Sequence, residues 1–167
     1  MSVSEWCQIV TAAAASVSFI MNAYLRHKNY VYSAAKGVST WLEDKVYPGN
    51  PPSQVCISNQ GKTALYNVFV FMDLNTYECS LDEHLDRVGE LQNPYFYFET
   101  FPANKDVSRG YQPNNAAGGH HLIPAMLFTD TNGNYWYRTP AGKLVRLRET
   151  YMDKLVKHAY VLGHVNA

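Results

Sequence analysis

The sequence predicts a mainly β protein: an immunoglobulin-like antiparallel β-sandwich with a long N-terminal helix and a short C-terminal helix. Three observations lead to this class. The first is a twenty-residue stretch without charge near the start of the chain, Trp6 to Leu25. The second is about seven short segments with strand-like alternation, separated by residues typical of tight turns. The third is the absence of any regular alternation of strands with helices, which argues against a parallel sheet.

The uncharged stretch predicts a two-part chain, with a hydrophobic helix in residues 1–36 and the β-sandwich with its C-terminal helix in residues 37–167. A helix of about twenty residues can cross the bilayer core. Arg26, His27 and Lys28 follow the stretch, and the positive-inside rule would then hold the following domain in the cytoplasm. The alternative is an assembly helix that packs through an apolar stripe at helical spacing. That stripe would consist of Ile9, Ala13, Val17, Ile20 and Tyr24.

Strand patterns begin after this helix. Trp41 is expected in a first edge strand, and Val46–Ser53 is expected to be a loop because it contains three prolines. A strand over Gln54–Asn59 follows, and then a long central strand over Thr63–Asp73 whose two faces are both apolar. Strict alternation would place the following residues on one face of that strand: Leu65, Asn67, Phe69 and Phe71.

A short helix is predicted in the acidic segment CSLDEHLDRVG. Ser80 and Glu83 have the spacing of a capping box, and Gly89 could end the helix. Leu81, Leu85 and Val88 would form its apolar stripe. His84 beside these acids could suggest a metal site, but a solvated helical turn is the favoured interpretation.

The second half of the β region is predicted to begin with a strand over Pro94–Phe101. An irregular connection then extends to His121. Three closing strands follow, with turns at Thr131–Gly133 and Pro140–Gly142, where Asn and Gly tolerate positive φ. A short amphipathic helix that ends at Gly163 closes the chain, and its apolar positions are Tyr151, Leu155 and Ala159.

Charge and cysteine content limit the functional classes. The chain has 14 Lys plus Arg and 14 Asp plus Glu, so nothing in its net charge indicates a nucleic-acid partner. Acids dominate residues 73–99 and bases dominate residues 138–157. These faces could be solvated or meet each other, or the basic one could face an acidic partner or anionic lipid. The three cysteines lack a CxxC pair, which favours a reducing compartment.

The search for chemistry yields no catalytic residue, no metal ligand set and no cofactor site. His120 and His121 are adjacent, and adjacent strand residues point to opposite faces, so they rarely bind one ion. The chain contains no HExxH, GxSxG or phosphate-loop spacing. An enzyme would therefore need a site near His120 and His121 that is completed by residues distant in sequence.

The candidate binding residues are Tyr135, Tyr137 and Arg138, because Tyr and Arg are enriched at interaction hot spots. Alternation places the two tyrosines on one face and Trp136 with Arg138 on the other. Trp136 is predicted to anchor the core, and the tyrosines are predicted to be more exposed. Asp130 and Arg138 flank the hairpin and could pair across it.

The order of segments also carries a resemblance. A hydrophobic helix followed by AAKGVSTW, SNQGKTALYNVFVFM and LFTDTNGNYWYRTPAGKL resembles a group of uncharacterised small actinobacterial and phage-borne proteins. That resemblance implies an N-terminal membrane helix and a tethered β-domain, and it implies no catalytic residues. Phe101–Pro102 departs from the group, in which a double proline is common here. The matching positions are Trp41, Asn59, Gly61, Tyr66, Asn67, Val68, Phe128, Asp130, Gly133, Trp136, Arg138, Gly142 and Leu144.

Three functional hypotheses follow. The first is a non-enzymatic protein-interaction module, of phage or prophage origin, tethered by residues 6–25 to the inner membrane with its C-terminal domain in the cytoplasm. The second is a structural subunit of a homo-oligomer or particle that assembles through its N-terminal helices and is soluble in the cytoplasm or particle-associated. The third is the enzyme with a site near His120 and His121.

Overall fold

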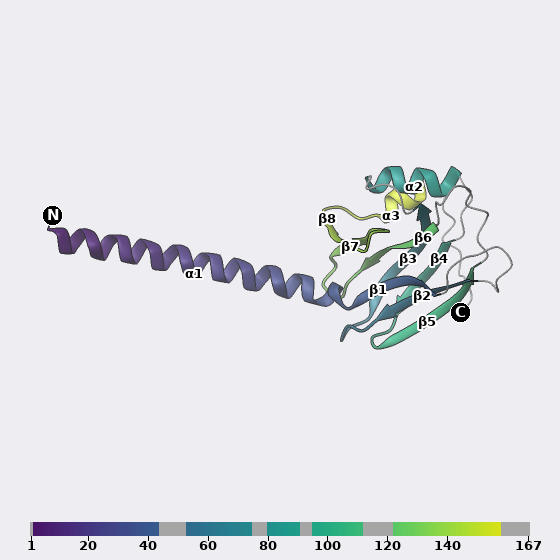
Figure 1. Cartoon of the computed structure of the whole chain (residues 1–167), viewed down its shortest axis with the longest axis horizontal. Coiled ribbons are helices and arrows are strands. Elements are labelled where there is room, and N and C mark those ends of the chain that lie inside the picture. Colours follow the sequence, from purple (N-terminus) through teal and green to yellow (C-terminus); the bar gives the residue numbers. More distant parts are fainter. Residues whose placement is uncertain (1, 44–52, 75–79, 91–94, 112–121, 158–167) are drawn as a thin grey trace. The chain divides into compact units, whose positions relative to one another are not determined.

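The computed structural model describes residues 2–43, 53–74, 80–90, 95–111 and 122–157 of the chain (Figure 1). The chain divides into two compact units, Met1–Ala34 and Ala35–Ala167. The first unit consists of most of helix α1, which runs from Val3 to Lys36. The second unit contains all the described strands and the two shorter helices.

Helix α1 contains 34 residues and extends beyond the uncharged stretch at both ends. Its first turn is closed by Ser2 and Glu5: the Ser2 amide donates to Glu5 Oε2 at 2.7 Å, and the Glu5 amide donates to Ser2 Oγ at 3.4 Å. Within the stretch, Thr11 Oγ1 donates to the Cys7 carbonyl at 2.8 Å and Ser16 Oγ to the Ala12 carbonyl at 2.9 Å. These hydroxyls therefore find acceptors on their own helix.

The second unit contains two antiparallel sheets. A three-stranded sheet has the order β1-β2-β5, with β1 at Val38–Glu43, β2 at Ser53–Asn59 and β5 at Lys105–Tyr111. A five-stranded sheet has the order β4-β3-β6-β7-β8. Its strands are β4 at Tyr95–Phe101, β3 at Leu65–Leu74, β6 at Leu122–Thr129, β7 at Tyr135–Arg138 and β8 at Leu144–Leu147. The predicted mainly β class is confirmed.

Both faces of the five-stranded sheet are buried along its central strands. One face is covered by α2 (Leu81–Glu90) and α3 (Met152–Lys157), which lie together over the sheet in Figure 1. The core on this face contains Phe69, Phe71, Leu85, Ala125, Leu127, Tyr137, Tyr151 and Leu155. The intervening residues of β3, Val68, Val70 and Met72, are also fully buried. This burial confirms the prediction of a central strand covered on both sides.

The alternation expected along β3 is interrupted at Asn67. Its φ is 50°, and the register to β6 shifts between Tyr66 and Phe69. Asn tolerates this left-handed conformation better than most residues with a side chain. The Asn67 carbonyl accepts a hydrogen bond from the Tyr151 hydroxyl at 2.7 Å, and its Oδ1 accepts one from the Tyr97 hydroxyl at 2.8 Å. The irregularity thus connects the strand to the residue that precedes α3.

Strand β5 was not predicted, because the segment after Phe101 was expected to be irregular. It pairs with β2 from Lys105 to Tyr111 and is an outer strand of its sheet. Most of its side chains are polar and exposed, and Val107 and Tyr111 carry its inward face. This edge strand has few apolar residues, so its sequence lacks the continuous or alternating hydrophobic pattern by which a strand is predicted.

A buried asparagine connects the two chain segments that cross from one sheet to the other. Asn59 is 0% exposed, and its Nδ2 donates to the carbonyls of Thr63 at 2.9 Å and Pro102 at 3.0 Å. Its Oδ1 accepts from the Gly61 amide at 3.0 Å. Thr63 lies between β2 and β3, and Pro102 lies between β4 and β5. Asn59 therefore holds the two crossing segments together and satisfies their backbone groups.

The local signals read from the sequence are confirmed at several places. Trp41 lies in β1, an outer strand, and the closing strands β6, β7 and β8 form a meander. Gly133 and Gly142 have φ values of 74° and 79°. The predicted loop at Val46–Ser53 falls outside the described residues except for Ser53, which begins β2. Ala159 and Gly163, expected to close the C-terminal helix, also lie outside the described residues.

Candidate functional site

The most unusual polar group in the core is a pair formed by Asp73 and His84. Asp73 belongs to β3 and is 0% exposed, and His84 belongs to α2 and is 1% exposed. His84 Nδ1 contacts Asp73 Oδ2 directly. A carboxylate at Nδ1 orients an imidazole and stabilises its charged form. The expectation that His84 lies on a solvated helical turn is therefore wrong: the helix buries this residue against the central strand.

The sequence does predict why the helix forms at this place. The Ser80 amide and hydroxyl both contact Glu83 Oε2, at 2.7 Å and 2.8 Å, and the Glu83 amide donates to Ser80 Oγ at 3.3 Å. This is the predicted capping box. It starts α2 one residue after Ser80, and this start places His84 and Leu85 against the sheet.

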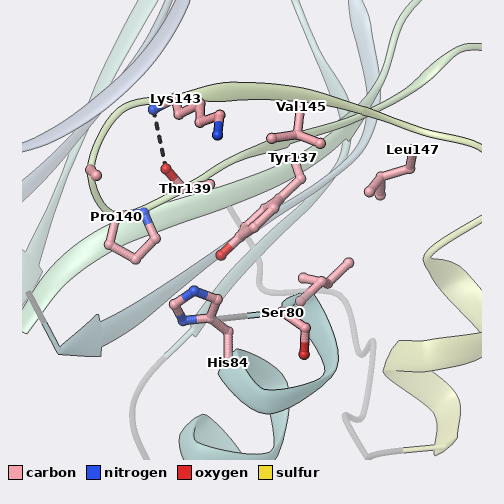
Figure 2. Close-up of a pocket in the computed structure, with 10 residues that line it drawn as sticks. Ser80, His84, Tyr137, Thr139, Pro140, Lys143, Val145 and Leu147 are labelled. Atoms are coloured by element: carbon pink, nitrogen blue, oxygen red, sulfur yellow. Dashed lines mark hydrogen bonds between the residues drawn. The ribbon is translucent and has the colours of Figure 1, made fainter. Parts of the chain in front are cut away.

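A pocket with a volume of about 260 Å³ lies between the start of α2 and the β7–β8 hairpin (Figure 2). Ser80, Leu81 and His84 line it from the helix side. Tyr137, Thr139, Pro140, Ala141, Lys143, Val145 and Leu147 line it from the hairpin side. The lining combines aliphatic groups with one imidazole, one phenol, one ammonium group and the hydroxyls of Ser80 and Thr139. This composition is typical of a recognition pocket, in which apolar contact gives affinity and few polar groups give orientation.

Tyr137 connects the pocket to the buried pair. Its ring lies 5.9 Å from the His84 ring, at an interplanar angle of 59°. The Tyr137 ring also stacks on the Phe71 ring, with the ring centroids 6.3 Å apart and an interplanar angle of 6°. Figure 2 shows the Tyr137 side chain directed toward the imidazole. Tyr137 therefore belongs to the wall of the pocket and to the core at the same time.

The expectation that Tyr135 and Tyr137 are more exposed than Trp136 is confirmed only in part. Trp136 is 0% exposed, as predicted, but Tyr137 is 3% exposed and thus also buried. Tyr135 is half-buried and meets Tyr151 edge to face at 5.9 Å. The correction has a simple cause: α2 and α3 cover the face that alternation assigned to solvent.

The third predicted binding residue, Arg138, faces away from Tyr137. Its Nη1 donates to the Gly142 carbonyl at 2.9 Å, and burial lowers the pKa of its guanidinium. The structure therefore assigns Arg138 a contact that supports the turn between β7 and β8. Of the three predicted residues, only Tyr137 reaches the pocket.

The predicted pairing of Asp130 with Arg138 is wrong. Asp130 is 1% exposed and accepts from the amides of Asn132 at 2.8 Å and Asn134 at 2.9 Å. It also accepts from Trp136 Nε1 at 2.9 Å and from Asn134 Nδ2. This carboxylate organises its own hairpin, and its hydrogen bonds are made by N–H donors within six residues of it.

Histidines 120 and 121, on which the enzyme hypothesis depends, lie outside the described residues. Within the described part of the chain, no group of three or more His, Cys, Asp or Glu side chains could hold a metal ion. Cys56 contacts Glu43 Oε2 and Ser108 Oγ, each at 3.3 Å, and burial raises the pKa of its thiol. A thiol in this environment is a poor nucleophile.

A second candidate surface lies on α1. By its length and composition, the helix is long and apolar enough to cross a membrane. Its exposed large apolar side chains within the uncharged stretch are Trp6, Ile9, Val10, Val17, Phe19, Ile20, Met21, Tyr24 and Leu25. An apolar surface of this extent is typical of a segment that a membrane or another protein surface covers.

No family model matches the chain, and neither does any curated protein sequence or solved structure with which it was compared.

Proposed function

We propose that this protein is a membrane-tethered, cytoplasm-facing interaction module without catalytic activity. Residues 6–25 form its transmembrane segment, and the β-domain, an immunoglobulin-like sandwich, binds a protein partner. The observation that carries the proposal is the exposed apolar surface of α1, a 34-residue helix whose side chains from Val3 to Tyr30 are all exposed. A bilayer would cover this surface along the whole uncharged stretch.

The ends of the stretch support the anchor. Trp6 and Tyr24 are 57% and 63% exposed, and eighteen residues of helix separate them by about 27 Å. That distance matches the spacing of the two interfaces at which Trp and Tyr are enriched. Arg26 and Lys28 lie two and four residues after Tyr24. Basic residues on this side favour a cytoplasmic location for the β-domain.

Strand order supports the immunoglobulin-like class. In that class the first, second and fifth strands share one sheet, while the third, sixth and seventh share the other. The orders β1-β2-β5 and β3-β6-β7 are present here. Strand β4 extends the second sheet beside β3, as added strands do in the variable-type domains. Strand β8 adds a further edge to that sheet.

The pocket at the β7–β8 hairpin supports an interaction role. Its concave lining carries a few polar groups and lies beside β8, which pairs only with β7 within the described part of the chain. Binding surfaces often combine these features. The buried Asp73–His84 pair stabilises the wall of this pocket rather than projecting into solvent. A phage or prophage origin rests on the resemblance described above.

A structural subunit assembled through α1 is the second candidate. Gln8, Thr11, Ser18 and Asn22 recur at intervals of three, four or seven residues, so they share one side of the helix. In lipid such a polar side would face neighbouring helices, whereas in water the apolar stripe of the helix would face them. In this alternative the partner of α1 is a second copy of the chain.

Membrane fractionation separates the two candidates. After expression in bacteria, an anchored chain stays in the membrane pellet through an alkaline carbonate wash and leaves it only with detergent. The Val17→Arg substitution should move it to the soluble fraction or to inclusion bodies, because a central Arg raises the cost of insertion by about 3 kcal/mol. The Val17→Leu substitution is the matched control and should stay in the pellet.

Orientation is tested by cysteine labelling from outside sealed spheroplasts. In a background with Cys7→Ser and Cys79→Ser, a membrane-impermeant maleimide should label Ser2→Cys and leave Lys62→Cys unlabelled until the cells are lysed. Labelling of Lys62→Cys in sealed cells would contradict the cytoplasmic location. If the wild-type chain stays monodisperse without detergent, as a particle of several copies, the membrane anchor is refuted and the structural subunit assembled through α1 is supported.

A further inference from the structure

Strand β8 forms one margin of the five-stranded sheet. It comprises Leu144–Leu147 and, within the described part of the chain, pairs only with β7. A strand in this position presents a row of backbone N–H and C=O groups to another chain. β8 is short, which limits unselective pairing at a sheet edge, and it lies beside the pocket.

The hairpin geometry identifies which backbone groups face outward. The Thr139 amide donates to the Lys143 carbonyl at 2.9 Å, and the register continues with Arg138 opposite Leu144. Hydrogen-bonded and non-hydrogen-bonded pairs alternate in an antiparallel ladder. Leu144 and Arg146 therefore occupy the non-hydrogen-bonded positions, and their N–H and C=O groups point away from β7.

The pocket lies on one side of this row. Val145 and Leu147 belong to its lining, and they lie opposite Tyr137 and Tyr135 in the ladder. A strand added beside β8 would place every second side chain on this same face. One apolar side chain of such a strand could therefore enter the volume of about 260 Å³ between the hairpin and α2.

Basic side chains dominate this edge. Lys143, Arg146 and Arg148 are exposed, and the segment 139–148 contains no acidic residue. The carboxylates on the facing turn of α2 are already engaged: Asp82 accepts from Lys154 Nζ at 2.7 Å, and Glu83 closes the capping box. Arg146 Nη2 donates to Asn134 Oδ1 at 2.5 Å, a neutral acceptor. Among the described residues, this edge therefore carries three exposed cations, and Glu149, which follows Arg148, is the exposed acid next to them.

We propose that β8 binds an acidic, extended segment of a partner protein by strand addition. The backbone of Leu144 and Arg146 would supply the ladder, the pocket would accept an apolar side chain, and Lys143 with Arg148 would attract carboxylates. This mode gives affinity through the main chain and specificity through alternate side chains. It rests on the proposed interaction function and assigns that function a surface and a class of partner.

The test uses the full chain in nanodiscs and a fluorescent eight-residue peptide of alternating glutamate and valine. Fluorescence anisotropy should show saturable binding, and the peptide should slow hydrogen exchange at the amides of Leu144 and Arg146. A peptide of alternating lysine and valine is the charge control and should not bind. Equal binding of both peptides, or unchanged exchange at these two amides, would overturn the proposal.

Two pairs of variants separate the contributions of the β8 backbone and of its positive charge to peptide binding. Leu144→Pro removes an outward N–H and leaves the ladder to β7 intact, so it should weaken peptide binding about tenfold. Leu144→Ala keeps the amide and should bind as the wild type does. The double variant Lys143→Gln with Arg148→Gln should weaken binding about fivefold, because each exposed charge contributes modestly. Lys62→Gln with Lys105→Gln removes two exposed charges elsewhere and should have no effect.

Failure of strand addition at β8 can be distinguished from failure of the membrane tether. A chain that binds the acidic peptide but fractionates as soluble would refute the membrane tether and leave this inference standing. A membrane-bound chain that ignores the peptide would refute the inference alone. Concentration-dependent self-association that Leu144→Pro abolishes, without peptide binding, would show that the edge pairs with a second copy and would also refute it.

Discussion

His84 Nδ1 contacts Asp73 Oδ2 inside the core, and this contact joins helix α2 to the central strand β3. Both side chains are almost completely buried. The pair lies behind Tyr137, and Tyr137 forms part of the pocket wall. The position of the helix, and with it the shape of the pocket, therefore depends on a polar contact between residues eleven positions apart.

Removal of one member of this pair should destabilise the β-domain. His84→Ala leaves the Asp73 carboxylate buried without its imidazole, and we expect the free energy of unfolding to fall by about 3 kcal/mol. Urea unfolding of the full chain in detergent, followed by tryptophan fluorescence, measures the change. His27→Ala alters an exposed histidine on α1 and should leave the value unchanged. An unaltered midpoint for His84→Ala would show that the pair does not hold the helix.

The β6–β7 hairpin should depend on Asp130. Asp130→Ala leaves the amides of Asn132 and Asn134 and the indole N–H of Trp136 without their buried acceptor. We expect a loss of about 2–4 kcal/mol in the free energy of unfolding. Glu149→Ala removes an exposed acid in the same region and is the control. If both variants unfold at the same urea concentration, the carboxylate is not the organising group.

The β7–β8 turn should require glycine at position 142. Gly142 has φ of +79°, a conformation that side chains with a Cβ rarely adopt. Gly142→Ala should reduce the free energy of unfolding by about 1 kcal/mol. Gly110 has open space around it and an ordinary φ, so Gly110→Ala should change stability much less. Thermal unfolding followed by circular dichroism compares the two variants. Equal decreases in their melting temperatures would contradict the requirement for glycine at position 142.

Stability should fall at alkaline pH in part through Tyr111. Burial raises the pKa of its hydroxyl from 10 to about 12. The folded state then holds the proton more tightly than the unfolded state. The contribution of the protonated Tyr111 hydroxyl to the free energy of unfolding is therefore complete below pH 10 and is lost as the pH rises through about 12.

Tyr111→Phe tests this contribution. The Tyr111 hydroxyl is buried and has no hydrogen-bond partner among the described residues, so its removal should raise the unfolding free energy at neutral pH by about 1 kcal/mol. The variant should also lose stability less steeply between pH 10 and 12. Tyr66→Phe changes a partly exposed phenol and serves as the control at neutral pH. A steeper alkaline loss in Tyr111→Phe would contradict the assignment.

The elements predicted from the sequence are those that depend on local physical chemistry. The capping box at Ser80 and Glu83, the glycine turns at positions 133 and 142, and the apolar pattern of β3 all act within a few residues. Each preference exists before the chain is compact, because it arises from backbone sterics, from a short-range hydrogen bond or from alternation along a strand. The same reasoning predicted Trp136 as a core residue.

Tertiary structure decided the features that join distant segments. It buried His84 on Asp73 and covered Tyr137 with α2, where the sequence alone indicated a solvated turn and an exposed ring. It also recruited the polar segment from Lys105 to Tyr111 as β5, because β2 offered it an edge. Periodicity reports how apolar a face is, whereas burial depends on which element covers that face, and only the packed chain determines this.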